Sequence, residues 1–449
     1  MKGSPEFRRN LWLEFTPQRL IAMPVILGVV FLLVTLGGRR ALDESTGTVA
    51  AFVFIVLIFL WGTRLAAETV IVEVHGRTWD QQRLSAIGAW QMAWGKLFGA
   101  PAYAWYGGLI CMVFYALSHA LQLPPGVLLS AVALYIAAGV MAHALSLLLS
   151  LQAVLRRRAF GRVQVLGYQV IAVVPAGMAL YGGLDGLGGN GGYAMTVWFG
   201  FSMTKLHFAL AAVAAFAAWA LAGTYALIRL EMMHRHGPWL WLGFVVFAMV
   251  FFSGLDYLPW RLPVTLTALP EGPSVAFLIA AAAAYAMAFA EPKHRVRFRQ
   301  LTHFSRAGQW RRVLELAPRS VLTLALAGGA AVAAGALADT THFSNIASLS
   351  DIRLSVLATF LFAVRDIGFV YVISLKHEAR AGGGEAQAFL FLVLAYTLLP
   401  ALVQTLSVGP LLAFAWPQWG EPPFWTIGAP LIEVCVVGYL LRRQLRSPG

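Results

Sequence analysis

The chain has 449 residues, of which 59% are hydrophobic and only 12% are charged, and its mean hydropathy is +0.72. Soluble globular proteins carry about 25% charged residues, so this composition excludes a soluble globular protein. The net charge is +13, a value that can indicate binding to nucleic acid or to an anionic membrane surface. The two cysteines, Cys111 and Cys435, are too few for a disulfide framework or a CxxC metal site.

Apolar runs of membrane-spanning length recur from Leu20 to Leu441. They predict an all-α polytopic membrane protein with about twelve transmembrane helices. The predicted spans cover residues 20–38, 47–67, 98–120, 125–153, 163–183, 206–228, 238–257, 274–290, 320–338, 354–375, 386–408 and 425–441.

Basic residues concentrate on alternate connections between these spans. Arg8 and Arg9, the run 156–158, the basic cluster between 293 and 319, and the last arginines all fall on one side. By the positive-inside rule this side is the cytoplasm, and both termini lie there. Orientation and contact with anionic lipid headgroups therefore account for the net charge. We expect membrane lipids, and no nucleic acid, among the partners.

The residues before the first span predict an amphipathic helix in the membrane interface. Phe7, Leu11 and Phe15 are four residues apart, which places them on one face of a helix. Pro17 is expected to mark the break between this helix and the first span.

A polar stretch from Glu73 to Lys96, EVHGRTWDQQRLSAIGAWQMAWGK, separates the second and third spans. Most connections in compact proteins are much shorter, so this one requires an explanation. Thr78 followed by Gln81 is typical of a capping box at a helix start, and a second short helix is expected over Ala89–Leu97. We interpret residues 73–96 as a helical elbow on the cytoplasmic surface of the membrane.

Five charged residues within or near the spans are candidates for an intramembrane polar pathway, because isolated charges in a membrane are costly. They are Arg64, Glu68, Arg365, Asp366 and Glu433. For Arg64 and Glu68, which are four residues apart, an interfacial ion pair is the favoured interpretation. Mutual pairing inside the helix bundle explains the other three equally well.

The chain divides into three predicted segments. Residues 1–237 hold six spans, residues 238–290 hold two additional spans, and residues 291–449 form a degenerate second repeat with an amphipathic helix and four spans. The repeat is suggested because GQWRRVLELAPRSVLTLAL at 308–326 echoes EFRRNLWLEFTPQRLIAMPVIL at 6–27. Internal repeats are common in transporters.

Residues 194–205 are expected to form a short interfacial or re-entrant helix.

The polar stretch resembles the first cytoplasmic loop of ABC-2 type transporter permeases. The matching positions are Glu73, Thr78, Ser85, Trp90, Gly95 and Lys96. The chain departs from the family pattern where Ala86 replaces a proline and where Gln82 and Arg83 replace paired leucines.

This resemblance implies a coupling helix at residues 75–91 that fits into a groove on a separate ATPase subunit. The implied contacts are Thr78, Trp79, Asp80, Gln81, Arg83 and Ser85, with Trp79 and Arg83 expected to contribute most because buried Trp and Arg dominate interface energetics. A second, weakened coupling segment is expected at Lys376, His377, Glu378 and Arg380.

The same resemblance implies an export permease of the bacterial inner membrane that is not itself an enzyme. The chain has no GxxxxGK[ST] phosphate loop, since Gly95-Lys96 is followed by Leu97. ATP and Mg²⁺ are therefore expected on ABC ATPase subunits, and no cofactor or metal is expected in this chain. Permeases of this family commonly pair six-span units, so a second permease chain is a further expected partner unless the second repeat takes its place.

Two other functional classes remain open from the sequence. The first is a twelve-span secondary transporter driven by an ion gradient. The second is a membrane-embedded enzyme that processes lipids, with Asp256, His342 and Asp351 on the outer face as its candidate residues. The spacing of these three residues does not indicate acid–base geometry.

Overall fold

The computed structural model describes residues 4–37, 43–85, 87–155, 162–185, 187, 194–234, 237–255, 271–337, 349–376, 384–406, 409–417 and 422–446. Ten helices in these ranges are long and apolar enough to cross a membrane, and a bent pair, Ala89–Gly99 with Ala102–His119, makes up to eleven. A shorter apolar helix covers Trp239–Ser253. The prediction of an all-α polytopic membrane protein is confirmed at this level.

The chain folds into two compact units. Unit 1 comprises residues 1–196 and 201–236, and unit 2 comprises residues 197–200 and 237–449. The helices that cover the two additional predicted spans pack within unit 2, since α12 (Glu271–Ala290) lies against both α11 (Trp239–Ser253) and α15 (Arg319–Ala336).

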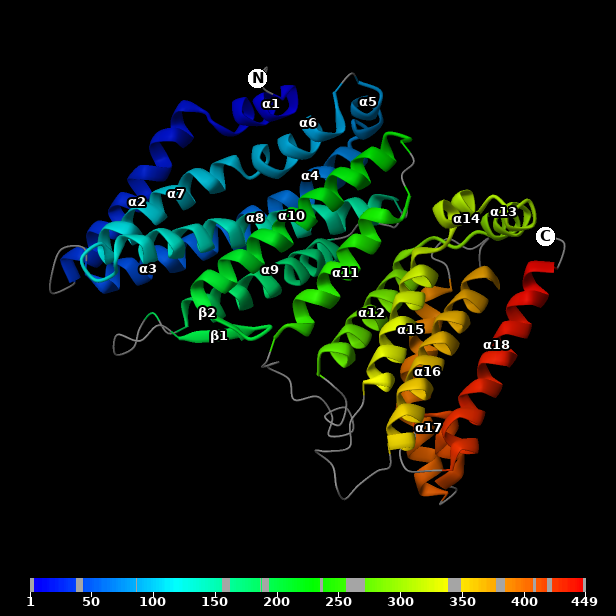
Figure 1. Cartoon of the computed structure of the whole chain (residues 1–449). Helices are drawn as coiled ribbons and strands as arrows, with labels where there is room; N and C mark the ends of the chain where they lie inside the picture. Colours follow the sequence, from blue (N-terminus) through cyan, green and yellow to red (C-terminus); the bar gives the residue numbers. More distant parts are fainter. Residues whose placement is uncertain are drawn as a thin grey trace. The chain divides into compact units, whose positions relative to one another are not determined.

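Unit 1 begins with a helix where the sequence predicts an amphipathic one, although its buried residues are Glu6 and Asn10. The break before the first span lies directly before Pro17, and the helix of that span starts at Pro17, three residues earlier than the predicted start. The helices of unit 1 are α1 (Pro5–Glu14), α2 (Pro17–Gly37), α3 (Glu44–Phe54), η1 (Ile55–Gly62), α4 (Thr63–His75), α5 (Trp79–Arg83), α6 (Ala89–Trp94), η2 (Gly95–Gly99), α7 (Ala102–His119), α8 (Pro125–Leu155), α9 (Arg162–Leu184) and α10 (Lys205–Glu231). Figure 1 shows α1 and α5 at the same end of these helices.

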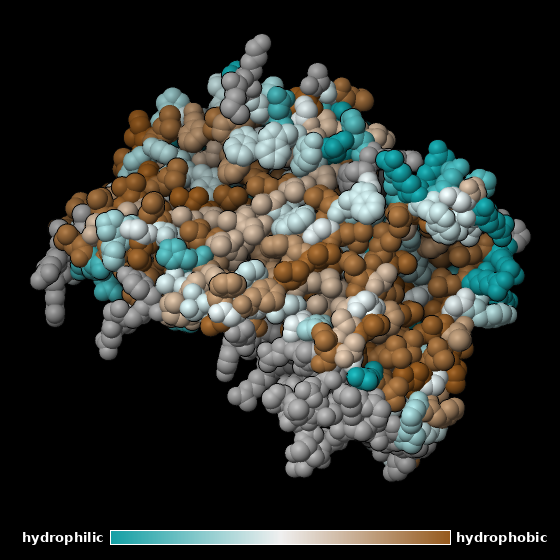
Figure 2. All heavy atoms as spheres, in the orientation of Figure 1, coloured by the Kyte–Doolittle hydropathy of each residue, from teal (hydrophilic) through white to brown (hydrophobic). Residues whose placement is uncertain are grey.

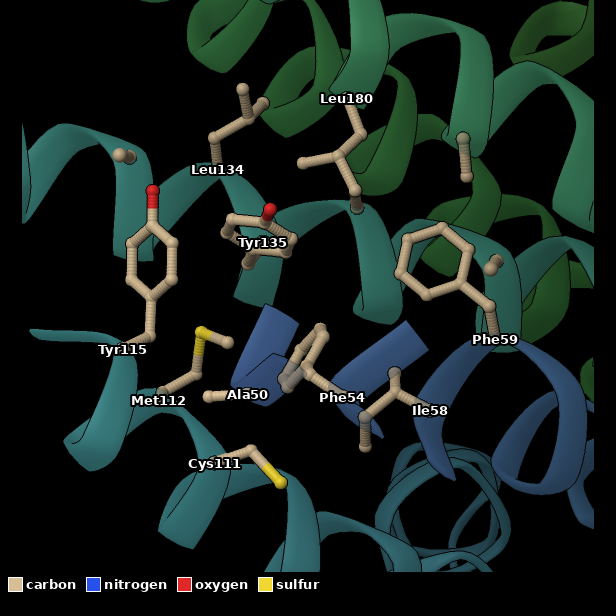
Figure 3. Close-up of a cluster of buried hydrophobic side chains, with 14 of the residues drawn as sticks. Ala50, Phe54, Ile58, Phe59, Cys111, Met112, Tyr115, Leu134, Tyr135 and Leu180 are labelled. Carbon is tan, nitrogen blue, oxygen red and sulfur yellow. The ribbon is translucent and has the colours of Figure 1, made fainter. Parts of the chain in front are cut away.

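The α3–η1–α4 helix is central to the core of unit 1 and packs against α7 and α8. Phe54 and Ile58 are fully buried, and the Phe54 ring meets the Tyr135 ring of α8 edge-on, with centroids 5.5 Å apart (Figure 3). The middle of this helix is the π-helical segment η1, which alters the backbone pairing. His143 Nε2 lies 2.9 Å from the Ile58 carbonyl oxygen, and Gln169 Nε2 donates to the Leu60 carbonyl at 2.7 Å. Neighbouring helices thus satisfy backbone groups that lipid cannot.

The prediction of a helix over residues 194–205 is wrong. The structure has a β-hairpin there, with strands β1 (Met195–Trp198) and β2 (Phe201–Thr204). Phe199 and Gly200 form the turn with φ of 47° and 79°, the left-handed conformations that a tight two-residue hairpin requires. The aromatic residues that suggested an interfacial helix also favour β-strands.

Unit 2 contains α11, α12 and α15, together with α13 (Arg295–Arg306), α14 (Trp310–Leu316), α16 (Leu349–Lys376), α17 (Glu385–Thr405), η3 (Gly409–Phe414), η4 (Phe424–Gly428) and α18 (Ala429–Arg446). Buried alanines line the contact between α12 and α15, for example Ala280 and Ala327. Small residues of this kind allow membrane helices to approach closely. Figure 2 shows hydrophobic side chains over the long helices and hydrophilic ones over α13 and α14.

Candidate functional site

The two ends of the elbow, residues 73–96, are joined by a buried ion pair. Glu73 lies in the last turns of α4 and Lys96 lies in η2, and the Lys96 ammonium contacts the Glu73 carboxylate. Lys96 is completely buried. Gln82 lies between them, since its Nε2 donates to Glu73 Oε1 at 2.8 Å and its Oε1 accepts from Lys96 Nζ at 3.1 Å. The first and last residues of this 24-residue stretch are therefore in direct contact.

Helix α1 completes the charge balance around Lys96. Glu6 Oε1 lies 3.6 Å from Lys96 Nζ, and Arg9 Nη2 lies 3.3 Å from Glu73 Oε1. Two cations thus face two carboxylates, which a buried charged cluster requires to avoid a large desolvation cost. Gly95 is needed at this contact, because a Cβ atom there would lie 2.6 Å from the Glu6 side chain.

Helix α5 is attached to the end of α10 as well. Trp79 Nε1 donates to Glu231 Oε2 at 3.3 Å, and Arg83 Nε donates to the Glu231 carbonyl oxygen at 2.9 Å. The Lys96 ammonium also lies over the Trp79 ring, 5.2 Å from its centroid, a favourable cation–π position. Helix α5 is thereby held to α4, to η2 and to α10.

The residues expected to form a coupling helix divide into inward and outward groups. Trp79 is 4% exposed, and Arg83 is half-buried against Glu231. Asp80, Gln81 and Ser85 are exposed. Sequence reasoning missed Leu84, which is 89% exposed beside them.

The predicted capping box is wrong. Thr78 makes no side-chain cap bond, and its hydroxyl donates to the Glu73 carbonyl oxygen at 3.3 Å instead. Ser85 Oγ donates to the Gln82 carbonyl at 2.6 Å. Helix α5 is five residues long and is therefore stabilised by tertiary contacts, because so short a helix is not stable alone.

An open cleft of about 310 Å³ lies between α1 and the elbow. It is lined by Pro5, Glu6, Arg9, Thr78, Gln81, Gln82, Ser85 and Ile87. The exposed side of α5 therefore adjoins a polar cleft whose inner wall is the Lys96 network.

A second polar cluster lies within unit 2, near the middle of four candidate spans. Arg365 of α16 donates from Nε to Asp366 Oδ1 at 2.8 Å and from Nη1 to Glu433 Oε2 of α18 at 2.7 Å. Tyr285 of α12 and Tyr396 of α17 each donate to Asp366 Oδ2 at 2.6 Å. The structure thus brings together three of the five residues expected to form a polar pathway.

The other two expected pathway residues belong to unit 1 and pair with each other. Arg64 Nε lies 2.8 Å from Glu68 Oε1 on α4, with the two side chains 53% and 31% exposed. Sequence reasoning missed Tyr285 and Tyr396, whose signal was weak because tyrosine is common in membrane helices.

The remaining expected residues are mostly outside the described part of the chain. Lys376 is the exposed last residue of α16, whereas His377, Glu378 and Arg380 lie outside the described residues. The same holds for Asp256 and His342 and for the side chain of Asp351, which had suggested a lipid-processing enzyme.

Within the described ranges, no group of three or more His, Cys, Asp and Glu side chains is placed to hold a metal ion. The chain was also compared with known proteins. No protein-family model, curated protein or solved structure matches it.

Proposed function

We propose that this chain is the membrane subunit of an ATP-binding cassette exporter in a bacterial inner membrane, moved by a separate ATPase that docks on α5. The observation that carries this proposal is the construction of the elbow. Its base is fixed to three membrane helices by buried bonds, while its tip is exposed beside a cleft.

Such a construction suits the transmission of force. A push on α5 reaches α4 through Gln82 and Glu73, the start of α7 through Lys96, and α10 through Glu231. Removing one partner from a buried ion pair costs about 3–5 kcal/mol. The bonds of Gln82 to this pair and of Trp79 to Glu231 resist separation of α5 from the spans, so displacement of α5 is expected to move the spans with it.

The proposed docking surface consists of Asp80, Gln81, Leu84 and Ser85. Leu84 supplies an exposed apolar side chain for a pocket on the partner, and the polar residues around it supply a rim, which is the usual anatomy of a protein interface. Trp79 and Arg83 position α5 and do not contact the ATPase. The resemblance instead implies that Trp79 and Arg83 are the main contacts with the ATPase.

The proposal places the α1–α5 end of unit 1 in the cytoplasm, together with both termini. Twelve spans result if the bent pair ending at His119 is one span and α11 is another. ATP and Mg²⁺ bind to the ATPase, and membrane lipids surround the spans. Unit 2 then has one of two roles. It takes the place of a second permease chain, with a weakened coupling segment around Lys376, or it is present in addition to a second permease chain.

The test is co-purification with the ATPase subunit encoded beside the gene for this chain. Leu84→Asp is expected to reduce the recovered ATPase at least about tenfold, because an aspartate cannot enter an apolar pocket. Leu121→Asp is the matched control, since Leu121 is a fully exposed leucine at the other end of α7. Both variants should unfold at the wild-type temperature. Equal ATPase recovery with both variants, or none with the wild type, contradicts the proposal.

A second variant tests force transmission separately from docking. Glu231→Gln keeps an acceptor for Trp79 but removes the charge that pairs with Arg83 at 3.4 Å. We expect normal ATPase recovery with a reduced stimulation of ATP hydrolysis by the membrane subunit in liposomes. Unchanged stimulation would show that the α5–α10 contact transmits nothing.

An ion-gradient-driven transporter is the second candidate, and one observation favours it. The charged cluster of Arg365, Asp366 and Glu433 lies in the middle of candidate spans, where ionisable residues are rarely found without a function. Gradient-driven uptake by the purified chain in liposomes without any ATPase would establish this candidate in place of the first.

A further inference from the structure

The intramembrane cluster of unit 2 carries one more negative than positive charge when all its members are ionised. Arg365 is the cation, and Asp366 and Glu433 are the two carboxylates. The two tyrosines that complete the cluster are neutral donors. An uncompensated charge among apolar helices is strongly unfavourable, so one carboxylate needs a further positive partner.

Asp366 is not that carboxylate, because both of its oxygens already accept hydrogen bonds. Oδ1 accepts from Nε of Arg365 at 2.8 Å and lies 2.7 Å from Nη2 of the same guanidinium, and Oδ2 accepts from the hydroxyls of Tyr285 and Tyr396 at 2.6 Å. Three hydrogen bonds and the ion pair with Arg365 thus occupy both oxygens of Asp366. The side chain is 1% exposed, so no other group can reach it.

Glu433 is bound differently. Its Oε2 accepts one hydrogen bond, from Arg365 Nη1 at 2.7 Å, and that same nitrogen also donates to the Phe414 carbonyl oxygen at 3.0 Å. Among the described residues no hydrogen bond reaches Glu433 Oε1. The side chain is 25% exposed, so this oxygen is accessible from outside the cluster.

We propose that Glu433 is a proton-binding site in the interior of unit 2. In the proton-bound state Oε1 carries the proton as a neutral carboxylic acid, while Oε2 continues to accept from Arg365. Release returns the proton to the medium and leaves the carboxylate. This inference does not rest on the proposed function, because it involves no ATPase and no residue of the elbow.

A proton fits this site better than a metal cation does. Cations such as Ca²⁺ and Mg²⁺ require several oxygen ligands, and both oxygens of Asp366 are occupied by donors. Glu433 alone offers a single free oxygen, which is enough for a proton.

Among the described residues Arg365 is the one that forms an ion pair with Glu433. The elements that pack against α18 are α16, η3, η4 and α13. α16 contributes Arg365 and Asp366, the sequences of η3 and η4 contain no charged residue, and α17 brings only Tyr396 to the cluster. Of the arginines on α13, Arg297 is paired with Glu291 at 2.7 Å, and Arg295 donates to the Leu375 carbonyl at the end of α16.

The experiment is infrared difference spectroscopy of the full-length protein in lipid nanodiscs during a pH titration. A protonated carboxylic acid in an apolar setting has its own carbonyl stretching band, which shifts in D₂O. We expect this band at neutral pH in the wild type and its loss in Glu433→Gln. The matched control is Glu14→Gln, which removes a glutamate of similar exposure, 27%, that is paired with Arg19 at 2.8 Å and should leave the band unchanged.

Thermal unfolding provides a second test of the proposal if the infrared band is difficult to resolve. Glu433→Gln resembles the protonated side chain, so its unfolding midpoint should stay at the wild-type value, whereas Asp366→Asn should lower it. An infrared band that survives in Glu433→Gln, or a midpoint lowered as far as by Asp366→Asn, overturns the proposal. Stabilisation of the wild type, but not of Glu433→Gln, by Na⁺ or K⁺ at constant ionic strength would identify a metal cation and overturn it as well.

Discussion

Both units contain a buried lysine that is paired with a glutamate and lies over an aromatic ring. Lys96 contacts Glu73 and lies 5.2 Å from the Trp79 ring, and Lys293 lies 3.3 Å from Glu385 and 5.4 Å from the ring of Tyr371 on α16. The two lysine side chains are 0% and 1% exposed. The same combination of ion pair and cation–π contact thus fixes one end of the helices in each unit.

The two arrangements differ in what they connect. In unit 1 the pair joins the two ends of one polar stretch, so the residues between them are held as a compact elbow. In unit 2 Lys293 precedes α13 and its partner Glu385 begins α17, so the pair joins separate segments and encloses no loop of its own. The degenerate repeat stays a prediction, and the Lys293–Glu385 pair does not join the two ends of a single polar stretch as the Glu73–Lys96 pair does.

Lys96→Met is expected to cause the largest loss of stability. It leaves the two buried carboxylates of Glu73 and Glu6 with Arg9, whose side chain is 49% exposed, in place of two cations, at a cost of about 3–5 kcal/mol. Thermal unfolding in detergent micelles measures the effect. Lys205→Met is the control, since Lys205 pairs with Asp185 on the exposed surface, where a pair contributes about 0–1 kcal/mol. Equal shifts for the two variants would show that the Lys96 network does not hold the elbow.

Lys293→Met is expected to lower stability by a smaller amount, about 1–3 kcal/mol. Its carboxylate partner Glu385 is 17% exposed and therefore partly solvated after the substitution. Hydrogen exchange adds a second comparison between the units. Lys96→Met should speed the exchange of amides throughout the elbow, whereas Lys293→Met should affect the start of α17. A larger loss of stability from Lys293→Met than from Lys96→Met would reverse the ranking of the two units.

The membrane helices were predictable because length and apolar composition are local properties. The existence of the elbow was predictable for the same reason, since a long polar stretch between two spans is visible in the sequence. Which of its residues face inward was not predictable. Trp79 is buried because of Glu231, a residue 152 positions away, and no local pattern in a five-residue helix distinguishes Trp79 from the exposed Leu84.

The intramembrane cluster was predictable only in part, for a related reason. Arg365, Asp366 and Glu433 were recognisable because charges are rare in apolar runs. The tyrosines that make Asp366 a saturated acceptor are not rare in such runs, so their role depends on how α12, α16 and α17 pack. The hairpin at residues 195–204 shows the same limit, since aromatic residues there suit either an interfacial helix or a strand.

Arg64→Gln is expected to have the smallest effect, about 0.3–0.5 kcal/mol. Arg64 and Glu68 are both partly exposed and, within the described ranges, pair with each other alone, one helical turn apart on α4. Thermal unfolding of Arg64→Gln beside Lys293→Met measures the difference between an exposed and a buried pair. If Arg64→Gln lowers the unfolding midpoint as much as Lys293→Met does, this face of α4 is covered in the intact protein. Arg64 and Glu68 would then again be candidates for a functional intramembrane site. A negligible shift limits the candidates for functional intramembrane charges to the cluster in unit 2, where Arg365 is paired with two carboxylates and Asp366 is 1% exposed.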